Sequence, residues 1–290
     1  VSIFPIVFLP LHYLCYSMQK MQVNINQLGA LFCSIFFLST EQVFSETVPL
    51  LNSPEVENPK SILFIGNSFF YYNNGVHKPL LGMVRANESL GKGHRFRNIT
   101  INSSSLEWHD VESYVTNERI GSFSITSKNK YKKYDPEKYD LAIMMDCSQC
   151  PIHEDRKELF NFYVDAHSKT LRDNGVEPSL LMTWAYKDKP EMIEGLAASY
   201  ISAANRNKAM VFPVGLAFQL SQEEYPAIDL FTLDKRHPSK AGTYLMASVI
   251  YSSVYNVSPV GNSYDYGLDQ KTQDTLQKMA WKALKNYKNI

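Results

Sequence analysis

The stretch ILFIGNS at residues 62–68 contains the pattern that decides the fold. Four apolar residues run directly into Gly-Asn-Ser, and a short apolar run closed by a turn is typical of a buried strand in a parallel sheet. In open α/β sheets, ligands bind just beyond the carboxyl ends of the strands. Ser68 is therefore expected at the reactive edge of such a sheet, at the start of a helix.

The rest of the chain alternates between strand-like and helix-like stretches. Further strands are expected at 95–101, 139–145, 179–184 and 210–214, and helices at 76–84, 154–174, 191–205, 241–255 and 276–284. Strands that alternate with helices at short intervals predict a parallel sheet covered on both faces. We therefore expect an α/β fold, a three-layer α/β/α sandwich around a central, mostly parallel five-stranded sheet.

A second motif lies far along the chain, where Asp234 and His237 are separated by two residues just before an apolar helical stretch. A carboxylate in that position can hold the Nδ1–H of the imidazole and leave Nε2 free to take a proton from a serine. Ser68, His237 and Asp234 are thus the candidate nucleophile, base and orienting carboxylate of a catalytic triad.

Gly66-Asn67-Ser68 after the first strand, together with Asp234-x-x-His237 near the end, resembles the SGNH (GDSL-like) hydrolase superfamily. The segments FIGNSFFYYNN, SSLEWH and HPSKAGTYLMA are similar to those of a bacterial branch of this superfamily, and the resemblance covers roughly residues 61–255. It implies a flavodoxin-like sandwich and serine esterase or acetylhydrolase chemistry that uses no cofactor and no metal. The Gly-x-Ser-x-Gly elbow of α/β-hydrolases is absent from the sequence, which argues against that fold.

The resemblance also implies an oxyanion hole, but two of its positions differ here. Where the family has a glycine, this chain has Ser103, and where the family has an asparagine, the nearest amide is Gln149. The expected donors are the N–H groups of Ser68 and Ser103 and the Gln149 side chain; an ordinary polar turn is the alternative for Ser103, and a helix cap is the alternative for Ser68. Asn67 and Trp184 are candidates for substrate contacts, and a core position is the alternative for Trp184.

The amino-acid composition limits the classes of function that the protein can have. Lys and Arg number 29, as do Asp and Glu, so the formal net charge is zero and the basic domain that nucleic-acid binding requires is missing. We expect a serine esterase or acetylhydrolase that cleaves a small acyl ester, with an O-acetylated carbohydrate as the favoured substrate. The alternative is a non-catalytic carbohydrate-binding protein that retains the fold.

Residues 1–45 have the pattern of a secretory signal peptide, and their first residues suggest an over-extended reading frame. The apolar run at 28–38 is shorter than the about 20 residues that a spanning helix needs. We expect a periplasmic or secreted protein with no stable membrane insertion after cleavage; an N-terminal membrane anchor is the alternative. Residues 46–60 are expected to form a linker, and 61–290 a single domain with a C-terminal helix.

Cys147 and Cys150 are the two cysteines beyond the leader. A Cys-x-x-Cys pair can be a redox motif, half of a zinc site or a local disulfide. A second pair that would complete a Cys₄ zinc site is missing from the sequence. Two ordinary thiols or one local disulfide are therefore favoured over a redox role.

Overall fold

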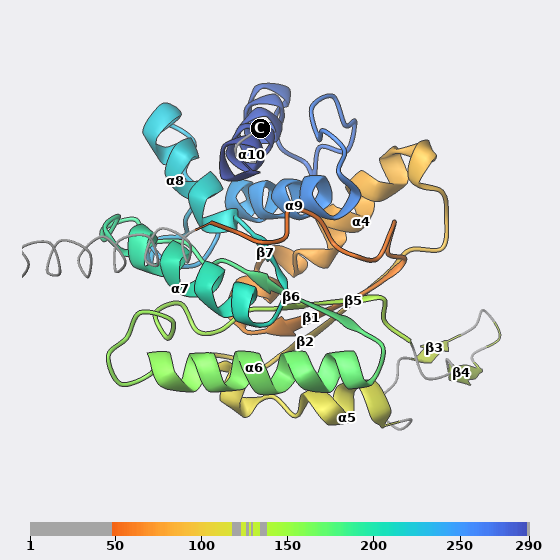
Figure 1. Cartoon of the computed structure of the whole chain (residues 1–290). Helices are drawn as coiled ribbons and strands as arrows, with labels where there is room; N and C mark the ends of the chain where they lie inside the picture. Colours follow the sequence, from red (N-terminus) through yellow and green to blue (C-terminus); the bar gives the residue numbers. More distant parts are fainter. Residues whose placement is uncertain (1–47, 118–122, 126–127, 129, 134–137, 289–290) are drawn as a thin grey trace, which may run out of the picture. The chain divides into compact units, whose positions relative to one another are not determined.

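The computed structural model describes residues 48–117, 123–125, 128, 130–133 and 138–288. Its central sheet has five strands in the order β2-β1-β5-β6-β7, and every pairing is parallel (Figure 1). These strands are β1 (Ser61–Gly66), β2 (Arg95–Thr100), β5 (Leu141–Met144), β6 (Glu177–Leu181) and β7 (Met210–Phe212). The predicted five-stranded sheet is confirmed, and it is parallel throughout.

The middle of β1 is buried on both faces. Ile62 and Phe64 pack into the core on one side of the sheet, whereas Leu63 and Ile65 pack into the core on the other side. Each of the four side chains is 0% exposed. Two-sided burial explains why the strand has a continuous apolar run instead of an alternating one.

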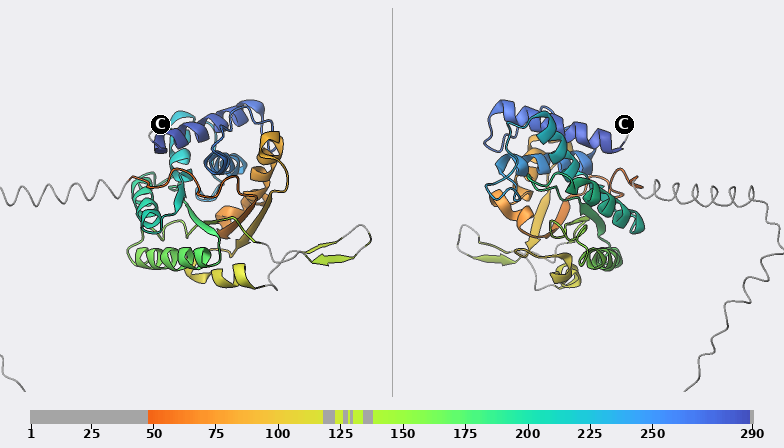
Figure 2. Two further views of the ribbon diagram at one scale, coloured as in Figure 1. Left: turned by 45° about the vertical axis from the view of Figure 1, so that its right-hand side comes forward. Right: turned by 90° about the vertical axis from the view of Figure 1, so that its left-hand side faces the viewer.

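Helices cover both faces of the sheet, which confirms the predicted three-layer sandwich (Figure 1). One face carries α4 (His77–Ala86), α8 (Val214–Glu224) and α9 (Lys240–Tyr255); the other carries α5 (Val111–Thr116), α6 (Lys157–Asp173) and α7 (Met192–Arg206). The C-terminal helix α10 (Gln270–Lys288) packs on α8 and α9, outside them (Figure 2). Because α9 lies between α10 and the sheet, all of its residues except Lys240 are buried.

The strand predicted at 210–214 ends earlier than expected. β7 ends at Phe212, and Pro213 occupies the N-cap position of α8, a helix that the sequence pattern did not indicate. β7 does lie at an edge of the sheet. Its position suits a segment that ends in proline, because proline has no N–H to donate to a neighbouring strand.

The described part of the predicted linker lies outside the helices and strands. Residues 48–60 contain no helix or strand, but they lie against the domain, where the backbone N–H groups of Glu55 and Val56 donate to the Glu177 carboxylate at 2.9 and 2.8 Å. A separate antiparallel pair consists of β3 (Phe123–Ile125) and β4 (Tyr131–Lys133). The leader predicted at 1–45 lies outside the described residues. Within the described ranges, none of the helices is long and apolar enough to span a membrane.

Candidate active site

Ser68 is held by a capped turn directly after β1. It is the first residue of the short helix α3 (Ser68–Tyr71), and Asn67 caps that helix by accepting the N–H of Phe69 at 3.2 Å. The amide nitrogen of Asn67 donates to the carbonyl oxygens of Ser104 at 2.9 Å and Asp146 at 3.2 Å. The buried Asn67 therefore ties together the segments that follow β1, β2 and β5, and this fixes the position of Ser68.

The histidine lies in a tight loop before α9. Phe231 and Pro238 form an isolated antiparallel bridge, and the N–H of Thr232 donates to the carbonyl of His237 at 2.9 Å. Ser239 caps α9 by accepting the N–H of Gly242 at 3.1 Å. A side chain at Gly242 would place its Cβ 2.3 Å from the Leu230 carbonyl oxygen, so glycine is required for this close approach.

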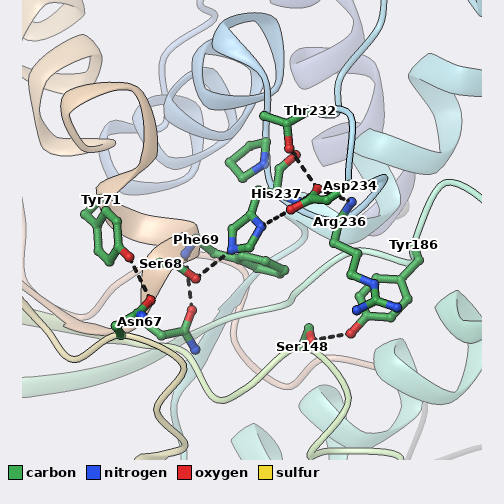
Figure 3. Close-up of polar contacts among 12 residues, drawn as sticks. Asn67, Ser68, Phe69, Tyr71, Ser148, Tyr186, Thr232, Asp234, Arg236 and His237 are labelled. Carbon is green, nitrogen blue, oxygen red and sulfur yellow. Dashed lines mark hydrogen bonds and ion pairs between the residues drawn. The ribbon is translucent and has the colours of Figure 1, made fainter.

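The structure brings the three predicted triad residues together (Figure 3). Ser68 Oγ lies 2.8 Å from His237 Nε2, and His237 Nδ1 contacts Asp234 Oδ2. The other carboxylate oxygen, Oδ1, accepts a hydrogen bond from Thr232 Oγ1 at 2.8 Å. It also accepts the backbone N–H groups of Arg236 and His237, each at 2.9 Å. The serine hydroxyl, the imidazole and the carboxylate therefore form one continuous series of contacts.

The electrostatics of Asp234 suit an orienting role. Burial opposes its negative charge, but the hydrogen bonds from His237, Arg236 and Thr232 outweigh that effect and hold the pKa of the carboxyl well below its usual range. A carboxylate that stays ionised keeps the proton of the imidazole on Nδ1. The Nε2 lone pair is then directed at the serine hydroxyl.

Aromatic rings enclose the imidazole of His237. The ring of Tyr72 stacks on it with centroids 4.1 Å apart and planes 11° from parallel, and Phe69 meets it edge-on at 5.3 Å. Trp184 in turn stacks on Phe69 at 4.5 Å and donates its indole N–H to the Arg236 carbonyl at 2.9 Å. Trp184 is 0% exposed, so the structure places it beneath the site, supporting the histidine loop.

The predicted oxyanion-hole residues lie in loops at the same edge of the sheet. Ser103 is exposed and has φ +57°, in the left-handed region where glycine is favoured, which suits a position that is glycine in the resembled family. Gln149 lies in a turn, where its backbone carbonyl accepts hydrogen bonds from the N–H groups of Ile152 and His153. Within the described ranges, neither Ser103 nor Gln149 hydrogen-bonds to Ser68. Their part in an oxyanion hole stays a prediction.

Asp146 is a structural link that the sequence analysis missed. Its carboxylate accepts the N–H of Leu106 at 3.1 Å and of Cys147 at 2.6 Å, so it joins the segments that follow β2 and β5. Burial raises the pKa of this carboxyl to about 6. A buried strand that ends in an acidic residue was the available signal, because such a residue needs hydrogen-bond donors from its surroundings.

Three further residues in the same region, Ser148, Tyr186 and Arg236, contact one another (Figure 3). Ser148 Oγ lies 2.6 Å from the hydroxyl of Tyr186, and the guanidinium carbon of Arg236 lies 4.8 Å from the centre of the Tyr186 ring. These residues follow β5, follow β6 and precede His237, respectively. From sequence, Ser148 and Tyr186 could have been indicated only by their positions after strands, and Arg236 only by its position next to His237.

Cys147 and Cys150 form a disulfide, which was one of the alternatives left open by the sequence. With Asp146 they are the one group of three metal-ligand side chains found close together among the described residues, within 4.8 Å. The disulfide occupies both thiols, so the group offers a single carboxylate and fits no metal ion.

A cavity of about 880 Å³ lies away from the triad. It is lined by residues such as Arg85, Lys92 and His94 beside the start of β2, whereas Ser68 lies at the carboxyl ends of the strands. Although this cavity is large, it is therefore not the site at which the triad residues could act.

No protein-family model matches the chain, and no curated protein matches it. Among solved structures it is similar to a DUF4886 family protein from Bacteroides uniformis, with 19% identity, a TM-score of 0.56, and coverage of 77% of this chain and 93% of that one. It is also similar to a GDSL-like protein from Parabacteroides merdae, with 12% identity, a TM-score of 0.52, and coverage of 70% and 99%. At these identities the likeness concerns the fold: the chain has the fold of the GDSL-like hydrolases, as the sequence resemblance implied.

Proposed function

We propose that the protein is a serine esterase that transfers a short acyl group, such as acetyl, from an ester to water. The observation that carries the proposal is the 2.8 Å contact between Ser68 Oγ and His237 Nε2, with Asp234 on the other ring nitrogen. A hydroxyl, a base and an orienting carboxylate in series are what nucleophilic acyl transfer needs. The fold supports the proposal but does not by itself specify an activity.

The reaction proceeds in two halves. His237 Nε2 takes the proton of Ser68 as the serine oxygen attacks the ester carbonyl, and Asp234 stabilises the imidazolium that forms. The imidazolium then protonates the leaving alcohol, which leaves the acyl group on Ser68. In the second half, His237 deprotonates a water molecule that attacks the acyl-enzyme. The acid is released, and the proton returns to Ser68.

The negative oxygen of each tetrahedral intermediate needs hydrogen-bond donors. We assign this role to the backbone N–H groups of Ser68 and Ser103, with the Gln149 amide as a third donor. The left-handed backbone at Ser103 supports the assignment, because it preserves the conformation that a glycine would adopt there. Loss of one such donor typically lowers kcat by about 10²–10³.

A small acyl ester is the substrate class, and an O-acetylated carbohydrate suits the predicted export of the chain to the periplasm or the medium. Asn67 shapes the site through its three hydrogen bonds, and Trp184 acts through Phe69 and the histidine loop. Asn67 is 4% exposed and Trp184 is 0% exposed, so each acts on the substrate mainly through the residues that it holds in place.

The experiment is hydrolysis of p-nitrophenyl acetate by the wild type, by Ser68→Ala and by Ser105→Ala, a matched change at another serine of the same sheet edge. Ser68→Ala is expected to lower kcat by at least about 10³ with an unchanged melting temperature, whereas Ser105→Ala keeps the wild-type rate. Equal turnover by Ser68→Ala rejects Ser68 as the nucleophile. A wild type that binds acetylated glycans without cleaving any ester would instead favour the carbohydrate-binding alternative.

A further inference from the structure

Arg236 precedes His237 in the chain, and its backbone is held on both sides. Its N–H donates to Asp234 Oδ1 at 2.9 Å, and its carbonyl accepts the indole N–H of Trp184 at 2.9 Å. The first contact belongs to the triad, and the second belongs to a fully buried side chain. The start of the Arg236 side chain is therefore fixed relative to the catalytic imidazole.

The guanidinium group of Arg236 lies over the ring of Tyr186, which is itself held in place by its surroundings. Its carbon lies 4.8 Å from the centre of the Tyr186 ring, well within the range of a cation–π contact. Tyr186 is only 6% exposed, and its hydroxyl is 2.6 Å from Ser148 Oγ. Figure 3 shows this group of residues beside Ser68 and His237, on the same edge of the sheet.

Two lysines near Arg236 in the sequence or in the adjacent loop are paired with carboxylates. Lys187 pairs with Asp229 at 2.8 Å, and Lys235 pairs with Asp188 at 3.4 Å. Over the ranges that the structure describes, Arg236 has no carboxylate partner for its side chain. The adjacent carboxylate, Asp234, already accepts hydrogen bonds from the imidazole, a hydroxyl and two backbone N–H groups.

A guanidinium whose carbon lies over an aromatic ring can still present N–H groups to a ligand. Their planar fork matches the two oxygens of a carboxylate, which it can bind through two parallel hydrogen bonds. Ser148 and Tyr186 share one hydrogen in the bond between them, so one of the two hydroxyls keeps a hydrogen to donate. The three side chains together present one positive charge and several donors.

We propose that Arg236, Tyr186 and Ser148 form an anion subsite beside the catalytic serine, and that the ester substrate carries a carboxylate, as an O-acetylated sugar acid does. The proposal rests on the proposed esterase function. It adds that the substrate class is anionic and that Arg236 is the residue that selects it.

The test compares two acetyl esters of similar shape, the anionic 4-acetoxybenzoate and its neutral methyl ester. The measured quantity is the ratio of their kcat/KM values in the wild type, Arg236→Gln, Arg236→Lys and Lys187→Gln. Because Arg236 adjoins His237, both rates are expected to fall in Arg236→Gln, and the ratio separates recognition from catalysis. The intrinsic reactivities of the esters cancel when ratios are compared between variants.

Arg236→Gln is expected to lower the anionic-to-neutral ratio by about tenfold, the effect of losing a hydrogen-bonded charge pair at a partly solvated site. Arg236→Lys keeps the charge but loses the fork, so its ratio falls less. Lys187→Gln removes a nearby but already paired cation and leaves the ratio unchanged. Added salt lowers the ratio in the wild type and not in Arg236→Gln.

The same ratio in the wild type and Arg236→Gln overturns the subsite and leaves the esterase proposal standing. An equal fall in Lys187→Gln also overturns it, because the effect is then one of general surface charge. Failure of the wild type to cleave either ester overturns the esterase proposal and the subsite with it.

Discussion

The substitution Asp234→Asn keeps the shape of the orienting side chain. It removes the negative charge and replaces one acceptor oxygen by a donor NH₂ group. Oδ1 of the carboxylate accepts three hydrogen bonds, from the Thr232 hydroxyl and from the N–H groups of Arg236 and His237. An asparagine keeps those three bonds if its oxygen occupies the same place. Its NH₂ group then faces His237 Nδ1, because the opposite orientation would gain one hydrogen bond but lose the two from the backbone N–H groups.

An NH₂ group can only donate, so Nδ1 must become an acceptor and the imidazole proton must move to Nε2. Nε2 can then no longer take the proton of Ser68. In a serine protease the equivalent change lowers kcat by about 10⁴, and we expect a fall of about 10³–10⁴ here. Thr232→Val is the matched control, because it removes one donor to Oδ1 and leaves the contact between Oδ2 and Nδ1 intact. Loss of that one hydrogen bond is worth about 1 kcal/mol, or roughly fivefold in rate.

The assay is kcat for p-nitrophenyl acetate near neutral pH, with a thermal melt of each variant. The Asp234 side chain is 43% exposed, so the variant is expected to fold like the wild type. A value of kcat within tenfold of wild type for Asp234→Asn would refute the orienting role. Thr232→Val falling as far as Asp234→Asn would show that loop conformation, and not the tautomer, controls the rate.

Three other changes test further parts of the site. Tyr72→Leu removes the ring stacked on His237 and is expected to lower kcat about fivefold, whereas Tyr72→Phe keeps the stack and the rate; equal losses would show that the hydroxyl matters instead. Burial raises the pKa of Asp146 from its ordinary 3.8 to about 6, so its contribution favours folding fully below pH 3.8 and is lost as pH rises through 6. Asp146→Asn should therefore gain roughly 3 kcal/mol relative to the wild type between pH 4 and pH 8 in urea unfolding, and a pH-independent difference would contradict this. The double change Cys147→Ser with Cys150→Ser should lower the free energy of unfolding by about 2 kcal/mol, and a reducing agent should destabilise the wild type but not the variant.

Much of the fold could be predicted because the central strands β1 and β5 are buried on both faces. That burial demands the continuous apolar runs seen in Ile62–Ile65 and Leu141–Met144, and a parallel sheet then brings the strand ends together. The contact between Asp234 and His237 could also be anticipated, because two side chains separated by two residues can meet within one turn. Helix α8 was missed because Val214 and the residues before it look like one continuous strand, and only Pro213 marks the change.

The surroundings of the triad could not be predicted in the same way. Tyr72 meets His237, and Arg236 meets Tyr186, across long separations in the sequence, so no local pattern carries those contacts. Trp184 follows β6, and periodicity did not decide whether its ring faces the core or a cleft. Its neighbours, Phe69 and Phe218, hold it in the core by stacking on its two faces.

Covalent labelling with diethyl p-nitrophenyl phosphate tests the central claim most directly. An activated serine attacks the phosphorus and releases p-nitrophenolate, so the labelled residue identifies the nucleophile. We expect one diethylphosphoryl group per chain, located on Ser68 by peptide mass spectrometry, with loss of acetate-ester hydrolysis in step with labelling and no labelling in His237→Ala. A chain that hydrolyses p-nitrophenyl acetate while Ser68 stays unlabelled, or that keeps its full rate once Ser68 is labelled, would contradict the account.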